Sequence, residues 1–298
     1  MDELREIDKR ESLRVVTSND LINAEDVAKL SLNARKLFYV AVSQCRKRDK
    51  EFYAFEISPT ELAEMWGVKR QDIYMMAKKI CKELMKVTLE LPNKKKGFKL
   101  RHVFELCDYD DDKMVQFKLH TEMTDLLLGL KRDFSKPLVW DFMRMRSPYS
   151  MAIWHLMQRE MHSFKPMMTA PIEFDISLEE LRKVTGTEDK LKKLSHFQER
   201  VLDKALVEIK RNCWVDITYT HIKQGRTVVG FRFTAQNVMG SMKIEDMPYR
   251  MQKQVRKAML TRKKADGVIT PDEYDELQAL ILELNQITLE DYINGYVE

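Results

Sequence analysis

The chain has 298 residues, of which 44% are hydrophobic and 33% charged, and its formal net charge is +4. This composition is typical of a globular protein with room for about two domains. No stretch is apolar over the roughly 18 to 20 residues that a membrane-spanning helix requires. The polar start, Met1–Arg5, is unlike a signal peptide. Four widely spaced cysteines argue against a zinc site or a disulfide framework, so we expect a reducing, cytoplasmic location and no cofactor.

The charges are distributed unevenly. Between Lys69 and Arg101 there are eleven Lys or Arg residues and three Asp or Glu residues, whereas beyond Ala265 there are nine acidic residues and no Lys or Arg. A basic middle indicates nucleic acid as a partner, and an acidic end indicates a tail or a protein contact. Ordinary solvated helix faces would explain either patch taken alone.

The first part of the chain predicts a helix, a strand and a helix pair. Residues up to Val16 are charged and are expected to be frayed. Apolar residues at helical spacing predict a core helix from the capping residue Ser31 to Val42, and Phe52–Ile57 is typical of a short strand. The run Ser58-Pro59-Thr60-Glu61 combines a capping box with a proline at the first helical position, which predicts a helix over 59–66 that ends at Gly67.

A basic helix and a hairpin follow. The pattern predicts a second helix over 69–86, with one apolar face and an opposite face of long polar and basic side chains. We then expect a strand over 87–91, a turn with three consecutive lysines over 92–97, and a strand from Phe98 to Leu106. Residues 115–119 predict a further strand, and residues 121–131 predict a helix or its beginning.

The second half of the chain predicts the same order of elements. Ser147-Pro148 opens a helix that reaches about His162. The stretch Ile172–Thr234 then predicts a short helix, a turn at Gly186, a long basic helix that begins near Lys190, and a β-hairpin. The buried face of the long helix is assigned to Leu194, Phe197, Val201, Leu202, Ala205 and Ile209.

The two halves form an internal repeat. A shift of 119 residues places Phe55–Ser58 on Phe174–Ser177 and Gly67 on Gly186. The fold class predicted is therefore α+β, with two tandem winged helix-turn-helix domains and a mostly helical C-terminal extension. The expected boundaries are 1–143 for the first domain, 144–240 for the second and 241–298 for the charged tail, with helices over 248–264 and 271–286.

The polar faces of the two basic helices and the two hairpin tips supply the candidate DNA-binding residues. Long cationic side chains at this spacing would reach phosphates, while Arg, His and Glu also match groups on base edges. The candidates in the second copy are Lys190, Lys192, Lys193, Ser195, His196, Glu199, Arg200, Lys204, Lys223 and Arg226. The candidates in the first copy are Lys69, Arg70, Gln71, Lys78, Lys79, Lys82, Lys94, Lys95 and Lys96.

A solvated helix with internal ion pairs is the alternative interpretation of the second basic helix. Its i,i+4 pairs Glu199–Asp203 and Arg200–Lys204 are both like-charged and therefore unfavourable within a helix. This favours a functional role for the face.

The chain resembles theta-type plasmid replication initiators that bind short direct repeats, called iterons. The residues that carry the resemblance are Ser18-Asn19-Asp20-Leu21-Ile22, Leu30-Ser31-Leu32 and Lys36-Leu37 at the front, then the run Phe197–Ala205, Glu208-Ile209 and the Lys223-x-Gly225-Arg226 hairpin. The resemblance covers about residues 15 to 235. It leaves the helices beyond Met242 without an assignment.

The resemblance implies which DNA contacts each of the two domains would make. They would bind one repeat together, with base-reading candidates at Lys193, His196 and Arg200, and contacts from Lys78, Lys79 and Lys94 of the first domain. It also implies a homodimer formed through the first domain's sheet, at Val103–Tyr109 and Met114–Leu119. Monomers would initiate replication and dimers would repress their own gene. Contacts with the host initiator and the replicative helicase would follow.

Two other classes of function compete with an initiator. An enzyme is disfavoured because the sequence has no GxxxxGK[ST] phosphate loop, no closely spaced histidine pair for a metal and no apparent catalytic triad. A transcriptional regulator with tandem winged helices shares all of the DNA-binding features, so the sequence does not separate it from an initiator. A partition or scaffold protein that uses the acidic tail is a third hypothesis.

Overall fold

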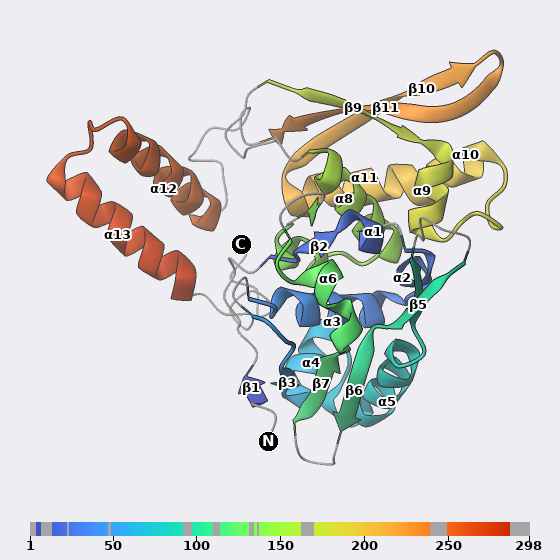
Figure 1. Ribbon diagram of the computed structural model, residues 1–298. Helices are drawn as coiled ribbons and strands as arrows, with labels where there is room; N and C mark the ends of the chain where they lie inside the picture. The colour runs from blue at the N-terminus through green and yellow to red at the C-terminus, as the bar shows by residue number, and fades with distance from the viewer. Residues whose placement is uncertain are drawn as a thin grey trace.

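The computed structural model describes residues 4–6, 14–22, 24–46, 49–91, 97–109, 114–130, 134–135, 137–161, 170–238 and 249–286. Figure 1 shows two winged-helix units one above the other and a separate pair of helices. The first unit contains β1 (Leu4–Glu6), β2 (Thr17–Ser18), α1 (Asn19–Ile22), α2 (Glu25–Ala28), α3 (Leu32–Ser43), β3 (Ala54–Ile57), α4 (Pro59–Trp66), α5 (Ile73–Leu84), β4 (Thr88–Leu91), β5 (Lys99–His102), β6 (Phe104–Tyr109), β7 (Val115–Leu119), α6 (Thr124–Leu127), β8 (Phe134–Ser135) and α7 (Val139–Met143).

The second unit repeats the order of helix, strand, two helices and hairpin. It contains α8 (Pro148–Glu160), β9 (Ile172–Ser177), α9 (Leu178–Thr185), α10 (Leu194–Phe197), a π-helical segment (Gln198–Leu202), α11 (Asp203–Cys213), β10 (Val215–Gln224) and β11 (Thr227–Asn237). The two-domain winged-helix prediction is therefore confirmed.

Matching local signals make the two helix pairs. Ser58 caps α4 by accepting a hydrogen bond from the Glu61 N–H, and Ser177 caps α9 by accepting one from the Glu180 N–H. At the other ends, Gly67 and Gly186 adopt left-handed backbone angles with φ of 65° and 61°. A left-handed position after a helix favours glycine because a side chain would strain the backbone. The 119-residue shift seen in the sequence thus superimposes a cap on a cap and a turn on a turn.

The sheets of the two units differ. In the second unit the strand order is β10-β11-β9, whereas in the first unit β4 and β5 form a separate pair and β3 joins the sheet β1-β3-β7-β6. The single strand expected from Phe98 to Leu106 was wrong because the chain changes partner at the buried residue Val103: β5 pairs with β4 and β6 pairs with β7. The frayed start was also wrong in part, since Leu4–Glu6 pairs in parallel with β3.

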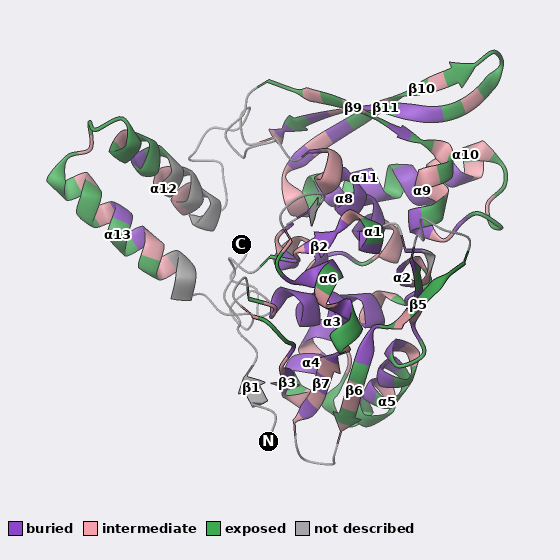
Figure 2. Cartoon of the chain, viewed as in Figure 1, coloured by how far each residue is buried: buried purple, intermediate pink, exposed green. Residues whose placement is uncertain are grey.

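Two helix boundaries also differ from the expectation. The long helix of the second unit begins at Leu194 rather than near Lys190, so Lys190, Lys192 and Lys193 lie in the preceding loop. Within residues 121–131, a 3-10 turn and the short α6 replace one longer helix. The core helix, by contrast, matches its prediction, and every residue of α3 from Ala34 to Ser43 is buried (Figure 2).

One hydrophobic core extends through both units, from Val15 to Ala235. Where α8 meets the first unit, the buried His155 joins three other elements. Its Nε2 lies 2.9 Å from Thr17 Oγ1 and 2.9 Å from Ser135 Oγ, and its Nδ1 lies 2.9 Å from the Tyr39 hydroxyl. All four side chains are buried, so this polar cluster is satisfied internally and fixes α8 against α3, β2 and β8.

The helices α12 (Tyr249–Ala265) and α13 (Pro271–Gln286) form a hairpin with its own small core of Leu260, Leu277 and Leu280. Their bounds agree with the predicted 248–264 and 271–286. The basic α12 pairs with the acidic α13: Arg256 contacts Glu276 at 2.8 Å, and further ion pairs join Lys263 to Glu273 and Lys253 to Glu283.

We predict that His155 makes the protein less stable in mild acid. Burial lowers the pKa of His155 to about 3, whereas an unfolded histidine titrates near pH 6.5. Between these values only the unfolded chain binds the proton, so the free energy of unfolding falls as the pH falls. From pH 6.5 to 5 the expected loss due to His155 is about 2 kcal/mol.

Urea unfolding of the unmodified protein and of His155→Gln at several pH values measures this effect. The variant should lose less stability on acidification by the stated amount. Asp141, whose pKa burial raises to about 6, opposes the effect in both proteins and cancels in the comparison. An identical pH dependence in the two proteins would show that His155 is not the group responsible.

Candidate DNA-binding surface

Free polar side chains are concentrated at the start of the long helix of the second unit. Ser195, Glu199, Arg200 and Lys204 are exposed, and His196 is half-buried. Among the described residues, none of these side chains has a hydrogen-bond or ion-pair partner. In helix-turn-helix proteins the N-terminal residues of this helix contact base edges. The unpaired side chains therefore lie at the positions from which helix-turn-helix proteins contact bases.

Two polar side chains farther along the helix, Asp203 and Lys210, are paired. Lys210 Nζ lies 2.6 Å from Asp216 Oδ2, and the Tyr219 hydroxyl donates to Asp203 at 2.7 Å. Asp203 is thus engaged with the hairpin and is not part of an i,i+4 network on the helix surface. The alternative interpretation, a solvated helix face with internal ion pairs, fits the second half of the helix better than the first half.

Arg182 organises the loop that leads into this helix, a role that the sequence reasoning missed. Its guanidinium donates to four main-chain carbonyls at 3.1 to 3.3 Å, those of Thr187, Lys190, Leu191 and Lys192. The same group lies 4.8 Å from the centre of the Phe197 ring, a cation–π contact. Burial lowers the pKa of Arg182. Backbone acceptors have no sequence signature, so no motif indicated this contact.

The loop presents three of the predicted cations. Lys190, Lys192 and Lys193 are exposed, and Leu191 between them adopts a left-handed φ of 50°. A leucine in this region is strained and persists only where surrounding contacts hold it. The carbonyl bonds of Arg182 are those contacts.

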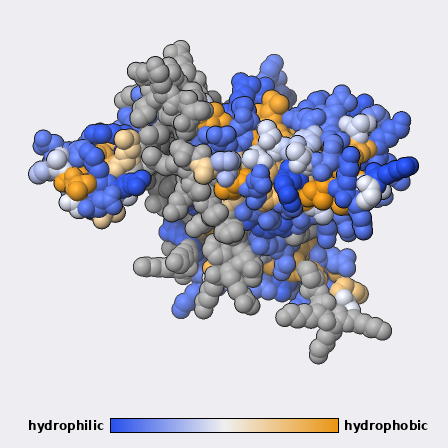
Figure 3. All heavy atoms as spheres, turned by 90° about the horizontal axis from the view of Figure 1, so that it is seen from above, coloured by the Kyte–Doolittle hydropathy of each residue, from blue (hydrophilic) through white to orange (hydrophobic). Residues whose placement is uncertain are grey.

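The hairpin of the second unit ends in an exposed basic tip. Residues 223–227 are all exposed and include Lys223, Arg226 and the left-handed Gly225 between them. This tip and the start of α10 lie at the same end of the unit (Figure 1). Viewed from above, the right-hand part of the molecule, which contains the second unit, has a predominantly hydrophilic surface with scattered apolar side chains (Figure 3). The tip matches the position of a wing beside the recognition helix.

The first unit presents its predicted candidates on α5 and the 3-10 turn (Arg70–Asp72) before it. Every candidate that the structure describes there is exposed: Lys69, Arg70, Gln71, Lys78, Lys79 and Lys82. Arg70 donates to Thr60 at 3.2 Å, and Lys78 lies over the Tyr74 ring at 5.7 Å. The wing lysines Lys94, Lys95 and Lys96 lie outside the described residues.

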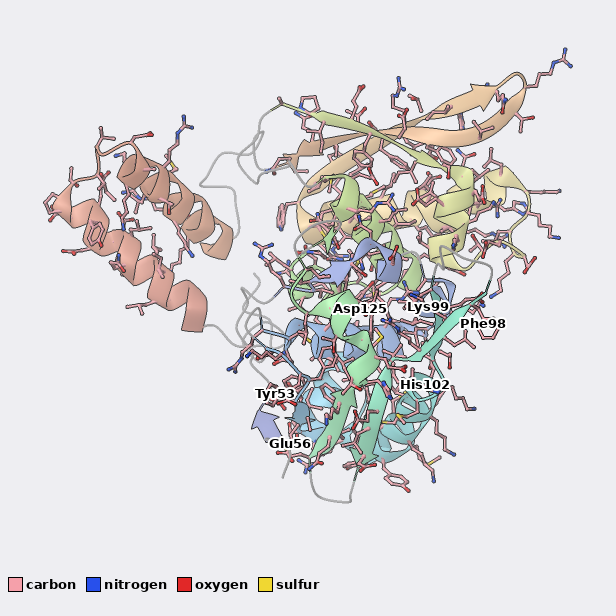
Figure 4. All side chains as sticks on the ribbon, viewed as in Figure 1. Tyr53, Glu56, Phe98, Lys99, His102 and Asp125 are labelled. Atoms are coloured by element: carbon pink, nitrogen blue, oxygen red, sulfur yellow. The ribbon has the colours of Figure 1, made fainter. Side chains whose placement is uncertain are left out.

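The strand β5 adds exposed residues that carried no predicted role. Phe98 is 71% exposed and Leu100 is 52% exposed, with the exposed Lys99 between them. Figure 4 shows Phe98 and Lys99 at the start of β5, His102 at its end, and Asp125 beside it. Arg101 is not free, since it pairs with Asp125 and donates to the Glu122 carbonyl at 2.7 Å. The outer part of the first wing is therefore both cationic and apolar.

The short helix α2 connects the two surfaces. It packs against α9 of the second unit and against β4 of the first wing. A Cβ on Gly186, at the end of α9, would lie 3.3 Å from the Ala28 carbonyl oxygen, so the approach of α9 to α2 is close. In Figure 1 the wing β5, helix α5, the start of α10 and the tip of β10–β11 all lie toward the right-hand side. The elements that carry the candidate residues of both units therefore lie toward the same side of the molecule.

Within the ranges that the structure describes, no three His, Cys, Asp or Glu side chains are grouped so that they would hold a metal ion. None of the described helices is both long enough and apolar enough to cross a membrane.

Taken together, the fold and the exposed basic surface define a tandem winged-helix protein of the DNA-binding class. The comparisons with known proteins agree. The family model described as initiator replication protein, WH1, matches residues 14–158, and the model described as initiator Rep protein, WH2, matches residues 177–235. The chain belongs to this family of plasmid replication initiators.

A solved structure shares the fold. The crystal structure of Pi initiator protein in complex with iteron DNA matches with a TM-score of 0.63 and 21% sequence identity, over 76% of this chain and 98% of that chain. No curated protein sequence matches the chain. Neither family model nor this structural match assigns a role to α12 and α13.

We predict that Arg182→Ala weakens DNA binding although Arg182 itself does not contact DNA. Loss of four carbonyl bonds should release the loop and misplace Lys190, Lys192 and Lys193. The expected decrease in affinity is about tenfold, or about 1.4 kcal/mol. Fluorescence anisotropy with labelled DNA measures it, and circular dichroism checks that the variant is folded. The matched control is Lys183→Ala, an exposed neighbour on the same helix, which should bind nearly as the unmodified protein does. Equal affinity of the two variants would contradict the role of Arg182.

Proposed function

We propose that this protein binds direct repeats at a plasmid origin as double-stranded DNA and thereby initiates replication. The observation that carries the proposal is the group of unpaired side chains, His196, Glu199 and Arg200, at the N-terminal half of the recognition helix. Their mixed chemistry suits base edges: Arg and His donate to guanine, and Glu accepts from cytosine. Membership of the initiator family supports the role, and so does the fold shared with a protein that was crystallised with iteron DNA.

The two units contribute differently in this proposal. The second unit, residues 144–240, reads bases with its helix and contacts phosphates through Lys190, Lys192 and the wing residues Lys223 and Arg226. The first unit, residues 1–143, holds the backbone through the lysines of α5 and its wing. Phosphate contacts fix position and orientation, and base contacts give specificity. The protein acts in the cytoplasm without a catalytic site of its own and relies on the host initiator and replicative helicase.

We predict that Arg200→Ala lowers affinity for the specific repeat by about 1–3 kcal/mol, as expected when a base contact is lost. Binding to unrelated DNA should change little, because nonspecific affinity depends on phosphate contacts. The matched control is Lys79→Ala in the first unit, which should weaken binding to both DNAs alike. Titration of each variant with repeat and scrambled duplexes at two salt concentrations measures the difference.

An unchanged ratio of specific to nonspecific affinity in Arg200→Ala would show that the recognition-helix assignment is wrong. A footprint on the DNA beside the gene tests the wider proposal. Tandem repeats of about two helical turns, next to an AT-rich stretch, support an initiator. A single protected operator without repeats would favour a transcriptional regulator.

We also propose that a dimer forms through the sheet of the first unit and represses the protein's own gene. In this sheet β6 is an edge strand, and an edge presents unpaired N–H and C=O groups to a second strand. Leu106 is half-buried on β6 and would contribute apolar contact.

We predict that Leu106→Lys raises the dimer dissociation constant at least about tenfold, because a charge on an edge strand opposes edge-to-edge pairing. Sedimentation velocity over a concentration series measures the constant. Val207→Lys is the control, since Val207 is also an apolar surface residue, 70% exposed, but lies on α11. An unmodified protein that stays monomeric at every concentration would exclude the dimer.

A further inference from the structure

The base of the second wing meets the recognition helix along one face of β10. Alternate residues of a strand point to the same side, so Val215, Ile217, Tyr219 and His221 share this face. The first two are buried, Tyr219 is half-buried and His221 is exposed. The contact between hairpin and helix therefore changes from apolar to polar at Tyr219.

A hydrogen-bond network makes the polar part of this contact. The Tyr219 hydroxyl donates to Asp203 Oδ1 at 2.7 Å and accepts from Gln198 Nε2 at 3.1 Å. Gln198 Nε2 also lies 2.9 Å from His221 Nε2. Two positions on the helix are thereby joined to two positions on the wing strand.

The ring of Tyr219 is held separately from its hydroxyl. Its centroid lies 5.1 Å from that of Phe231 in an edge-to-face arrangement and 6.0 Å from that of Phe233. Both phenylalanines are buried on β11. Removal of the hydroxyl alone would therefore leave the aromatic packing in place.

The network also brackets an irregular part of the helix. The π-helical segment runs from Gln198 to Leu202, so Gln198 is its first residue and Asp203 follows its last. Between these two anchored positions lie Glu199 and Arg200, which are exposed and unpaired among the described residues. Short π-helical segments often occur at functional sites, because they turn side chains out of the regular helical direction.

The outer part of the hairpin lies beyond an irregularity in the strand pairing. The pairing of β10 and β11 shifts register between Ile222 and Lys223. Beyond this point residues 223–227 are exposed, and they include the wing cations Lys223 and Arg226. The direction of the wing relative to the helix is therefore set at Tyr219 and His221, just before the irregularity.

We propose that Tyr219, bonded to Gln198 and Asp203, is a positioning residue that locks the wing onto the recognition helix. The lock lets Lys223 and Arg226 reach phosphates of the same site whose bases Glu199 and Arg200 contact. The part of this inference that concerns DNA binding rests on the proposed function. The hydrogen bonds of the lock, by contrast, are present in the protein without DNA. Tyr219 itself touches no DNA in this role.

Hydrogen–deuterium exchange on the free full-length protein tests the lock. In Tyr219→Phe, the amides of residues 220–224 should exchange about tenfold faster, while those of β9 and α9 stay unchanged. Asp203→Ala should have the same effect. Asp203→Asn is the matched control, since its amide oxygen still accepts the bond and should restore the slow exchange. Unchanged exchange in both Tyr219→Phe and Asp203→Ala would overturn the lock.

A double-mutant cycle with a single-repeat duplex tests the effect on DNA binding. In the unmodified protein, the pair Lys223→Ala and Arg226→Ala should lower affinity about tenfold, as expected for two phosphate contacts. In the Tyr219→Phe background the same pair should cost less than about threefold, because the wing is already misplaced. A structural role without positioning would leave the two losses equal, and that result would overturn the inference.

The exchange experiment and the double-mutant cycle distinguish failure of the lock from failure of the proposed function. An unmodified protein that does not prefer repeat DNA over scrambled DNA would overturn the proposed function and with it the role of the wing at the repeat. The exchange experiment would then still decide whether Tyr219 fixes the hairpin, because it uses no DNA.

Discussion

The arrangement of the two units depends on a buried guanidinium that has no carboxylate partner among the described residues. Arg35 of α3 is 2% exposed, and its Nη2 donates to the carbonyls of Val27 and Ala28 at 2.8 and 2.9 Å. These carbonyls end α2, where the backbone carries partial negative charge. Burial lowers the pKa of Arg35. The bonds hold α2 against the core, and α2 in turn contacts both α9 and β4. One side chain thus links the first wing to the helix pair of the second unit.

The charged side chains of the second unit divide into those paired within the protein and those left unpaired. Arg232 and Asp175 join neighbouring strands through two bonds of 2.8 Å, and Arg159 bonds Glu180 at 2.7 Å between α8 and α9. Such pairs are oriented toward their partners inside the protein. Arg200 and Glu199, by contrast, have no partner among the described residues. Charged side chains left unpaired at the start of a recognition helix are available to bind a ligand.

Local signals in the sequence were sufficient for the helix pairs. Ser58, Gly67, Ser177 and Gly186 act within a few residues of their own position, so the caps, the turns and the internal repeat could be predicted. The change of partner at Val103 could not, because it depends on which distant strand, β4 or β7, lies beside the chain. The helix start at Leu194 was misplaced for a similar reason, since the loop before it is held by Arg182 from another helix.

In the candidate site, too, some features could be predicted from the sequence and others could not. Exposure of the polar face was predictable from helical periodicity, and every described candidate except the half-buried His196 is exposed. The sequence did not reveal the residues that hold the candidate face in position but are not part of it. Arg182 binds main-chain carbonyls, and Tyr219 bonds two helix positions that are 16 and 21 residues away in sequence. Contacts of this kind leave no periodic pattern, so only the folded chain identifies them.

The C-terminal hairpin shows why charge density alone is a weak guide to DNA binding. As a sequence, α12 is more basic than α5, yet Arg256, Lys263 and Lys253 each pair with a glutamate of α13. Among the described residues, Lys78, Lys79 and Lys82 of α5 form no ion pair with a carboxylate. Removal of α13 would therefore create a basic surface that the intact protein does not have, and DNA binding by such a truncated chain would not show that α12 binds DNA. The acidic helix α13 acts, in this structure, as the partner of α12.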